Sequence, residues 1–263
     1  MKESLLMGAL GFAVSFFLLW IYGLKKPDAK GILFCLICLL AILALKFYYF
    51  AALMPAMISC IVTQRLCRLP ALSNLSWFLP FILVLIFVLT TALTAVLHPI
   101  LHPSVFMESL LRNYEATLLL SQGKNVFYFP ELTGDWLSLL SQFPKAVFIG
   151  LFRPLPGDVN SAVGYMSALE NIVILAFAVI TIIYLVIKKP VVENSIMLTT
   201  AGLYIIILSF ILPIASPNWG SLIRYKIGYL PFLLLLVTFR NPLILYLDKK
   251  FLKGKEAFDS VLK

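Results

Sequence analysis

Seven long apolar stretches, separated by short segments that hold most of the charge, constrain this chain more than any other feature. A helix needs about 20 mostly apolar residues to cross a bilayer, and 62% of these 263 residues are hydrophobic while only 13% are charged. A soluble domain of this size could not bury so much apolar surface. We predict an all-α, polytopic transmembrane helical bundle of about seven spans. The predicted spans are Ser4–Leu24, Gly31–Leu45, Phe47–Gln64, Trp77–Leu97, Asn171–Ile187, Ser195–Ala215 and Ile227–Phe239.

Two parts of this arrangement are irregular. Ile227–Phe239 covers only about 20 Å at 1.5 Å per residue. It therefore has to extend through Lys226 by snorkelling, or to continue past Arg240. Lys46 alone divides the second span from the third, so Gly31–Gln64 can also be read as one long, tilted helix.

The unequal division of Lys and Arg between alternate loops predicts the orientation, because cytoplasmic loops are the richer in both. One side holds thirteen of them and the short segments of the other side hold four. The thirteen are Lys25, Lys26, Lys30, Arg65, Arg68, Lys188, Lys189, Arg240, Lys249, Lys250, Lys253, Lys255 and Lys263; the four are Lys2, Lys46, Arg224 and Lys226. We therefore predict an N-terminus outside and a C-terminus in the cytoplasm.

The net charge of +9 requires no nucleic-acid partner. In the predicted topology the basic excess lies next to the membrane, where it meets anionic lipid headgroups. The tail, residues 240–263, can be an interfacial helix or a solvated basic segment. Membrane lipid is thus the first predicted partner, and the sequence does not specify an oligomeric state.

Cysteine and histidine indicate no metal or redox site. Cys35 and Cys38 form a Cys-x-x-Cys pattern, but inside an apolar helix, where they read as small buried hydrophobes. His98 and His102 have a metal-like spacing, yet a proline follows each of them and no third ligand is evident. We predict no metal and no cofactor.

Residues 98–170 form the longest segment outside a span, and we place them outside the cytoplasm. Val105–Leu120 carries apolar residues at helical spacing, and Trp136–Phe143 is a second short amphipathic piece. Together they predict a small helical cap. The chain then divides into transmembrane helices at 1–97, the cap and a re-entrant segment at 98–170, transmembrane helices at 171–239, and a basic cytoplasmic tail at 240–263.

The re-entrant segment, Pro144–Asp158, reads as an apolar half-helix that ends at an arginine among prolines. Irregular backbone at membrane depth is tolerated only against protein or a wet cavity. We therefore expect Arg153 and Asp158 to face a cavity, with Glu170 near it at the start of the fifth span. The Arg153 guanidinium can bind a phosphate, or it can form a structural pair with Asp158 or Glu170.

Arg224 and Tyr225 belong to a second outward cationic site, which can contact a ligand or anchor the chain at the interface. Lys46, among aromatic residues, can likewise be a snorkelling anchor or a lipid-phosphate contact. We predict that both arginines converge on one outer-face cavity, and the sequence identifies no catalytic residue. The predicted substrate-binding residues are Arg153, Asp158, Glu170, Arg224 and Tyr225.

Three short motifs carry a resemblance to a known family. They are Leu151–Pro156, Ser167–Asn171 and Pro217–Tyr225. Over roughly Leu33–Phe239, the chain resembles the C-terminal half of bacterial multi-span, glycosyltransferase-like membrane proteins of cell-envelope polysaccharide synthesis. The resemblance implies a location in the bacterial cytoplasmic membrane and a polyprenyl-phosphate-linked sugar as substrate.

The resemblance also implies a catalytic acid in the first outer loop of such enzymes, where this chain offers only Lys2 and Glu3. The chain is then expected to be an N-terminally truncated portion, or a member that has lost that half. Three functions stay open: a glycosyltransferase- or polymerase-like enzyme, a transporter or flippase of lipid-linked saccharide, and a non-catalytic assembly subunit.

Overall fold

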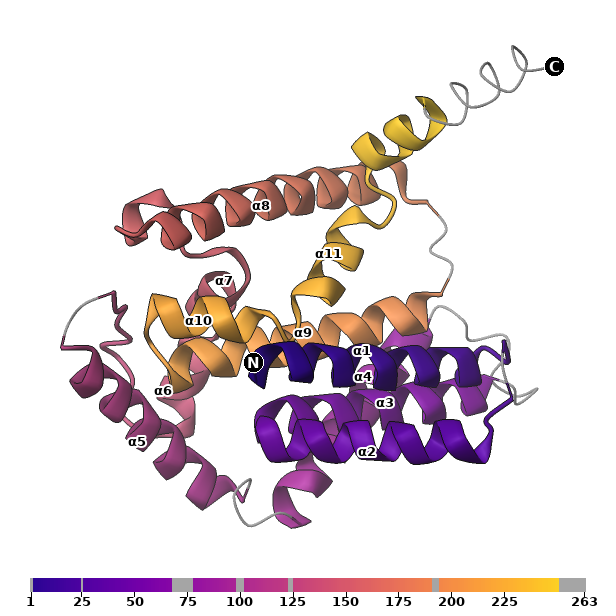
Figure 1. Ribbon diagram of the computed structural model, residues 1–263, viewed down its shortest axis with the longest axis horizontal. Helices are drawn as coiled ribbons and strands as arrows, with labels where there is room; N and C mark the ends of the chain where they lie inside the picture. The colour runs from indigo at the N-terminus through magenta and orange to yellow at the C-terminus, as the bar shows by residue number, and fades with distance from the viewer. Residues whose placement is uncertain are drawn as a thin grey trace.

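The computed structural model describes residues 2–24, 26–67, 78–97, 102–122, 125–190 and 194–250, and it is an all-helical bundle across these ranges (Figure 1). The predicted all-α class is confirmed. The α-helices are α1 (Lys2–Ile21), α2 (Ala29–Leu45), α3 (Phe47–Cys67), α4 (Leu79–Leu97), α5 (Pro103–Ser121), α6 (Trp136–Ser141), α7 (Phe143–Phe152), α8 (Ala162–Lys188), α9 (Ser195–Ala215), α10 (Trp219–Lys226) and α11 (Leu230–Thr238); η3 (Pro156–Asp158) is a short 3-10 helix.

Five of these helices are long and apolar enough to cross a membrane: α1, α3, α4, α8 and α9. A sixth crossing results if α10 and α11, which meet at an angle of 68°, are one broken span. These lengths and compositions fit a multi-pass membrane protein. The 17 residues of α2 cover only about 25 Å at 1.5 Å per residue. A seventh crossing by α2 therefore stays a prediction.

Lys46 separates two helices that fold back on each other. It is the only non-helical residue between α2 and α3, and the two helices pack side by side (Figure 1). Its backbone leaves the helical region, with φ −153° and ψ 83°, while its N–H donates to the Ile42 carbonyl. The alternative of one continuous helix over Gly31–Gln64 is therefore wrong.

The helices alternate in direction, so successive connections lie at opposite ends of the bundle. The N-terminus, the α2–α3 junction and the cap helices α5 and α6 lie at one end, called the cap end below, on the left of Figure 1. The C-terminal ends of α1, α3, α8 and α11 share the opposite end. The basic residues predicted to be cytoplasmic therefore gather at one end as far as they are described. Lys25, Arg68, Lys253, Lys255 and Lys263, like Trp77 and His98, lie outside the described residues.

The cap is packed against the bundle. The helix predicted over Val105–Leu120 is present as α5, and the piece predicted at Trp136–Phe143 divides at Gln142 into α6 and the start of α7. A β-bridge between Val126 and Asn218 ties the segment after α5 to the α9–α10 connection. One buried cluster joins α5, the segment after it, α6, α7, α8, α9 and α10; it includes Met107, Leu110, Phe129, Leu139, Ile149, Ala168, Ile214 and Leu222.

The helix α8 begins earlier than the sequence predicted. The predicted span starts at Asn171, whereas α8 starts at Ala162 and is 27 residues long. Ser161 caps its N-terminus, because the Ser161 hydroxyl accepts a hydrogen bond from the Gly164 N–H at 3.1 Å. Glu170 therefore lies inside a helix and not at its positive N-terminal end.

Labelling can test the topology. In a cysteine-free background, single cysteines at Gln122 and at Lys250 should react with a membrane-impermeant maleimide from opposite sides, with Gln122 outside. A cysteine at Lys26 should behave like the one at Lys250, because both residues lie in predicted cytoplasmic segments. Labelling of Gln122 and Lys250 from the same side would overturn the predicted orientation.

Close packing of α7 on α9 requires a glycine. A β-carbon at Gly150 would lie 2.2 Å from the Ser209 carbonyl oxygen, so Gly150→Ala has to push the two helices apart. We expect a loss of about 1–3 kcal/mol of unfolding free energy, typical of overpacking. The measurement is thermal unfolding of the purified protein in detergent. Gly8→Ala in α1 is the control, because nothing lies within 4 Å of that position, and an equal melting temperature for both variants would contradict the packing argument.

Candidate functional site

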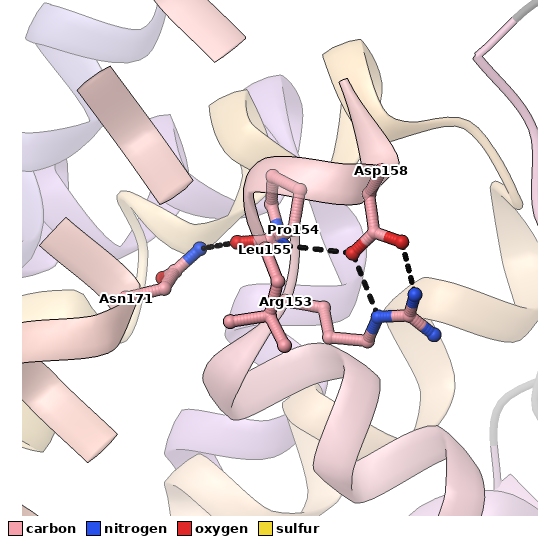
Figure 2. Close-up of polar contacts among 5 residues, drawn as sticks. All are labelled: Arg153, Pro154, Leu155, Asp158 and Asn171. Carbon is pink, nitrogen blue, oxygen red and sulfur yellow. Dashed lines mark hydrogen bonds and ion pairs between the residues drawn. The ribbon is translucent and has the colours of Figure 1, made fainter. Parts of the chain in front are cut away.

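Arg153 and Asp158 form an ion pair where α7 ends (Figure 2). The Arg153 Nε donates to Asp158 Oδ2 at 2.8 Å, and a second guanidinium nitrogen donates to Oδ1. The Asp158 carboxylate also accepts the Leu155 N–H at 2.7 Å, so it closes the turn that follows α7. The guanidinium carbon lies 5.1 Å from the centre of the Trp219 ring. The structural pair, one of the two predicted readings of Arg153, is thus present.

Asn171 connects this turn to α8. Its side-chain N–H donates to the Pro154 carbonyl at 2.9 Å (Figure 2). Its side-chain oxygen accepts a hydrogen bond from the Lys226 ammonium at 2.8 Å. Asn171 is 1% exposed, so both of its polar groups are satisfied inside the protein. A single amide therefore bridges α8, the turn after α7 and α10.

Lys226 is the most deeply buried charged group in the described part of the chain, at 4% exposed. Besides Asn171, its ammonium donates to the Leu151 carbonyl at 3.1 Å, at the C-terminal end of α7. A helix C-terminus carries partial negative charge, which stabilises a cation there. No carboxylate lies within ion-pair distance in the described residues, although exposed Glu170 on α8 acts on Lys226 electrostatically.

Three tyrosines donate hydrogen bonds to backbone carbonyls in α7 and at the connection between α10 and α11. Tyr229 donates to the Gly150 carbonyl at 2.7 Å, Tyr204 to Gly228 at 3.1 Å, and Tyr49 to Tyr225 at 2.5 Å. Tyr49 also lies so close to Gly228 that a β-carbon there would be 2.0 Å from its ring. The non-helical backbone between α10 and α11 is thus held by side chains from α3 and α9.

The predicted site residues fall into separate groups. Arg153 and Asp158 pair with each other beside Trp219, the first residue of α10. Arg224 is exposed in the last turn of α10, and Tyr225 next to it lies under the Lys46 ammonium, which is 4.2 Å from the ring centre. The described partners of Arg153 are Asp158 and Trp219, and no described contact joins either of them to Arg224, so the convergence of the two arginines on one cavity stays a prediction.

A cavity of about 400 Å³ lies at the cap end, between α3, α4 and α9 on one side and the cap helices α5 and α6 on the other. Its lining is almost entirely apolar and includes Phe47, Ala52, Ala95, Trp136 and Ile211. The hydroxyls of Tyr48 and Thr91, which also line it, are buried without a hydrogen-bond partner in the described structure. The sequence did not predict this cavity, because its walls come from five separate helices.

The described residues include only some of the histidines and cysteines considered as metal or redox ligands. Across the described residues, no group of three or more His, Cys, Asp or Glu could hold a metal ion. His98 lies outside that part, and His102 precedes α5 as its N-cap residue. Cys35 and Cys38 are buried free thiols in α2, as expected for small apolar residues.

Comparison with protein-family models, with curated proteins and with solved structures found no match to this chain. The resemblance to glycosyltransferase-like membrane proteins therefore stays a prediction.

Asn171→Leu tests the buried polar network. The substitution removes the side-chain partner of the Lys226 ammonium and the donor to the Pro154 carbonyl, and leaving a buried polar group without its partner costs about 1–3 kcal/mol. We expect a clear fall in the melting temperature of the purified protein in detergent. Val173→Leu, on an exposed position of the same helix, is the control. If both variants have the same melting temperature, the network contributes nothing to stability.

Proposed function

We propose that this protein binds a polyprenyl-phosphate-linked sugar in the bacterial cytoplasmic membrane and takes part in cell-envelope glycan synthesis, as a glycosyltransferase- or polymerase-like protein. One observation carries the proposal: the apolar cavity of about 400 Å³ at the cap end of the bundle. Binding sites for small molecules have volumes of about 300–1,000 Å³ and are lined mostly by apolar and aromatic side chains. The resemblance of the Arg153 and Arg224 motifs supports the same substrate class.

The position of the cavity suits a lipid substrate. It lies where α3, α4 and α9 meet the cap helices, so an apolar chain bound in it would be held among transmembrane helices while its headgroup stays at the cap end. A fully apolar chain needs no hydrogen bonds from the wall, which fits the composition of the lining. A free sugar would leave most of its hydroxyls unpaired in such a cavity.

The cavity is suited to binding. No Asp, Glu or His is among the residues that line the cavity within the described structure, so no acid–base pair is assigned. The carboxylate of Asp158 is engaged by Arg153, and Glu170 is exposed on α8. Any sugar transfer would then need a group from outside the cavity wall.

Transport of the same lipid is the second candidate, and the discontinuous helices favour it. Transporters build their binding sites from interrupted helices whose ends meet near the middle of the membrane. Here α7 ends against Lys226 of α10, and α10 meets α11 at 68°. Movement of a fluorescent lipid-linked sugar across vesicles containing the protein, without sugar transfer, would favour this candidate over the enzyme.

Filling the cavity tests the proposed substrate class. Ala95→Trp should weaken binding of a radiolabelled polyprenyl phosphate in nanodiscs by about tenfold or more, since a loss of 1.4 kcal/mol has that effect. Val96→Trp is the matched control, because Val96 is exposed and does not line the cavity. Equal binding by the wild type and both variants would contradict the proposal.

A further inference from the structure

We propose that Lys46 and Arg224 form a phosphate-binding site next to the cavity. The ring of Tyr225, the residue after Arg224, lies against Lys46 in this site. An amphiphile with a phosphate headgroup would place the phosphate against these cations and its apolar tail between α3, α4 and α9. The inference rests on the proposed function, because it assigns the headgroup of the same lipid.

Lys46 is held in place without using its hydrogen-bond donors. Its ammonium lies 4.2 Å from the centre of the Tyr225 ring and 5.7 Å from that of Tyr48. Neither a hydrogen bond nor an ion pair of its ammonium occurs with another described residue. Contact with aromatic faces positions the cation, while its three N–H donors stay available to an anion.

Lys46 is continuous with the wall of the cavity. The next two residues of α3, Phe47 and Tyr48, line the cavity directly. Because Lys46 is the single residue between α2 and α3, its position is fixed by two packed helices. A phosphate bound by Lys46 would therefore lie next to the cavity wall that Phe47 and Tyr48 form.

Arg224 adds a second cation at the same place. It precedes Tyr225, whose carbonyl accepts the Tyr49 hydroxyl at 2.5 Å, so the end of α10 is fixed to α3. The centre of the Tyr225 ring, in the residue next to Arg224, lies 4.2 Å from the Lys46 ammonium, which brings the last turn of α10 to Lys46. The Glu3 carboxylate at the start of α1 acts electrostatically on both cations. Neither Lys46 nor Arg224 forms an ion pair with a described carboxylate, so both positive charges stay available to an anion.

Arg153 is less suited to the phosphate. Its guanidinium is already engaged by both oxygens of Asp158 and covered by Trp219. Binding a phosphate there would first require breaking a pair that also closes the Leu155 turn. The structure therefore favours Lys46 over Arg153, although the sequence placed Arg153 first.

The experiment compares a polyprenyl phosphate with the polyprenol of the same chain length, both binding to the full chain in nanodiscs. We expect the wild type to bind the phosphate at least about tenfold more tightly, with a preference that falls as salt increases. Lys46→Met should remove most of this preference and leave polyprenol binding unchanged, which also shows that the variant is folded. Lys46→Arg should keep it.

Two further arms identify the source of the phosphate and the role of Glu3. Inorganic phosphate at the concentration of the lipid should fail to displace it, because the tail contributes to binding; displacement would overturn the assignment to a lipid. Glu3→Gln should tighten binding of the polyprenyl phosphate, since it removes a competing carboxylate. Unchanged or weaker binding would count against the proposed cation pair.

The outcomes separate this inference from the proposed function. If the wild type binds polyprenol and polyprenyl phosphate equally, and Ala95→Trp weakens both, the headgroup site is wrong and the tail cavity stands. If neither lipid binds, the proposed function fails as well. If Lys46→Met keeps the full preference for phosphate, the preference has another origin and the inference is overturned.

Discussion

The structure depends on side chains that hydrogen-bond to backbone groups where helices end or break inside the apolar bundle. Such backbone is tolerated only where protein groups replace the missing partners, because lipid supplies none. At the junction of α7, α10 and α11, these partners are Lys226, Asn171 and Tyr229, which bind the Leu151, Pro154 and Gly150 carbonyls. These contacts fix the end of α7 and, with it, the Arg153–Asp158 turn and the start of α10. Arg224 lies in the same last turn of α10 as Lys226, so this network, which does not touch the ligand, also positions the proposed cation pair.

The same network explains why a charged group can be buried here. The Lys226 ammonium has lost its water, yet it faces the carbonyl end of one helix and an amide oxygen from another. Each partner is a dipole with its negative end toward the ammonium, so it offsets part of the cost of burying the charge. Lys226 thus serves the fold, whereas Lys46, which meets only aromatic faces, keeps its donors available for binding.

The spans were predictable because hydropathy belongs to single segments, and the α-helical class and the break at Lys46 followed from it. The junction was not predictable, because Lys226 meets residues 55 and 75 positions away. Arg153 and Asp158 are close in the chain, so their pairing was among the expected readings. The predicted start of the span in α8 was wrong. The helix begins at its Ser161 cap with less apolar turns, which a search for apolar runs leaves out. The only sign of the junction in the sequence was that Lys226 directly precedes a span too short to cross the membrane.

The single-residue joint at Lys46 has a consequence for how the chain enters the membrane. In the predicted topology α2 also crosses the membrane, and with no loop between them α2 and α3 would insert together as a helical hairpin whose tip is a cation. In the predicted orientation that tip moves outward against a membrane potential that is negative inside, at a cost of about 2.3 kcal/mol per 100 mV. In that orientation a neutral residue at the tip would make biogenesis easier, so the lysine would oppose efficient insertion.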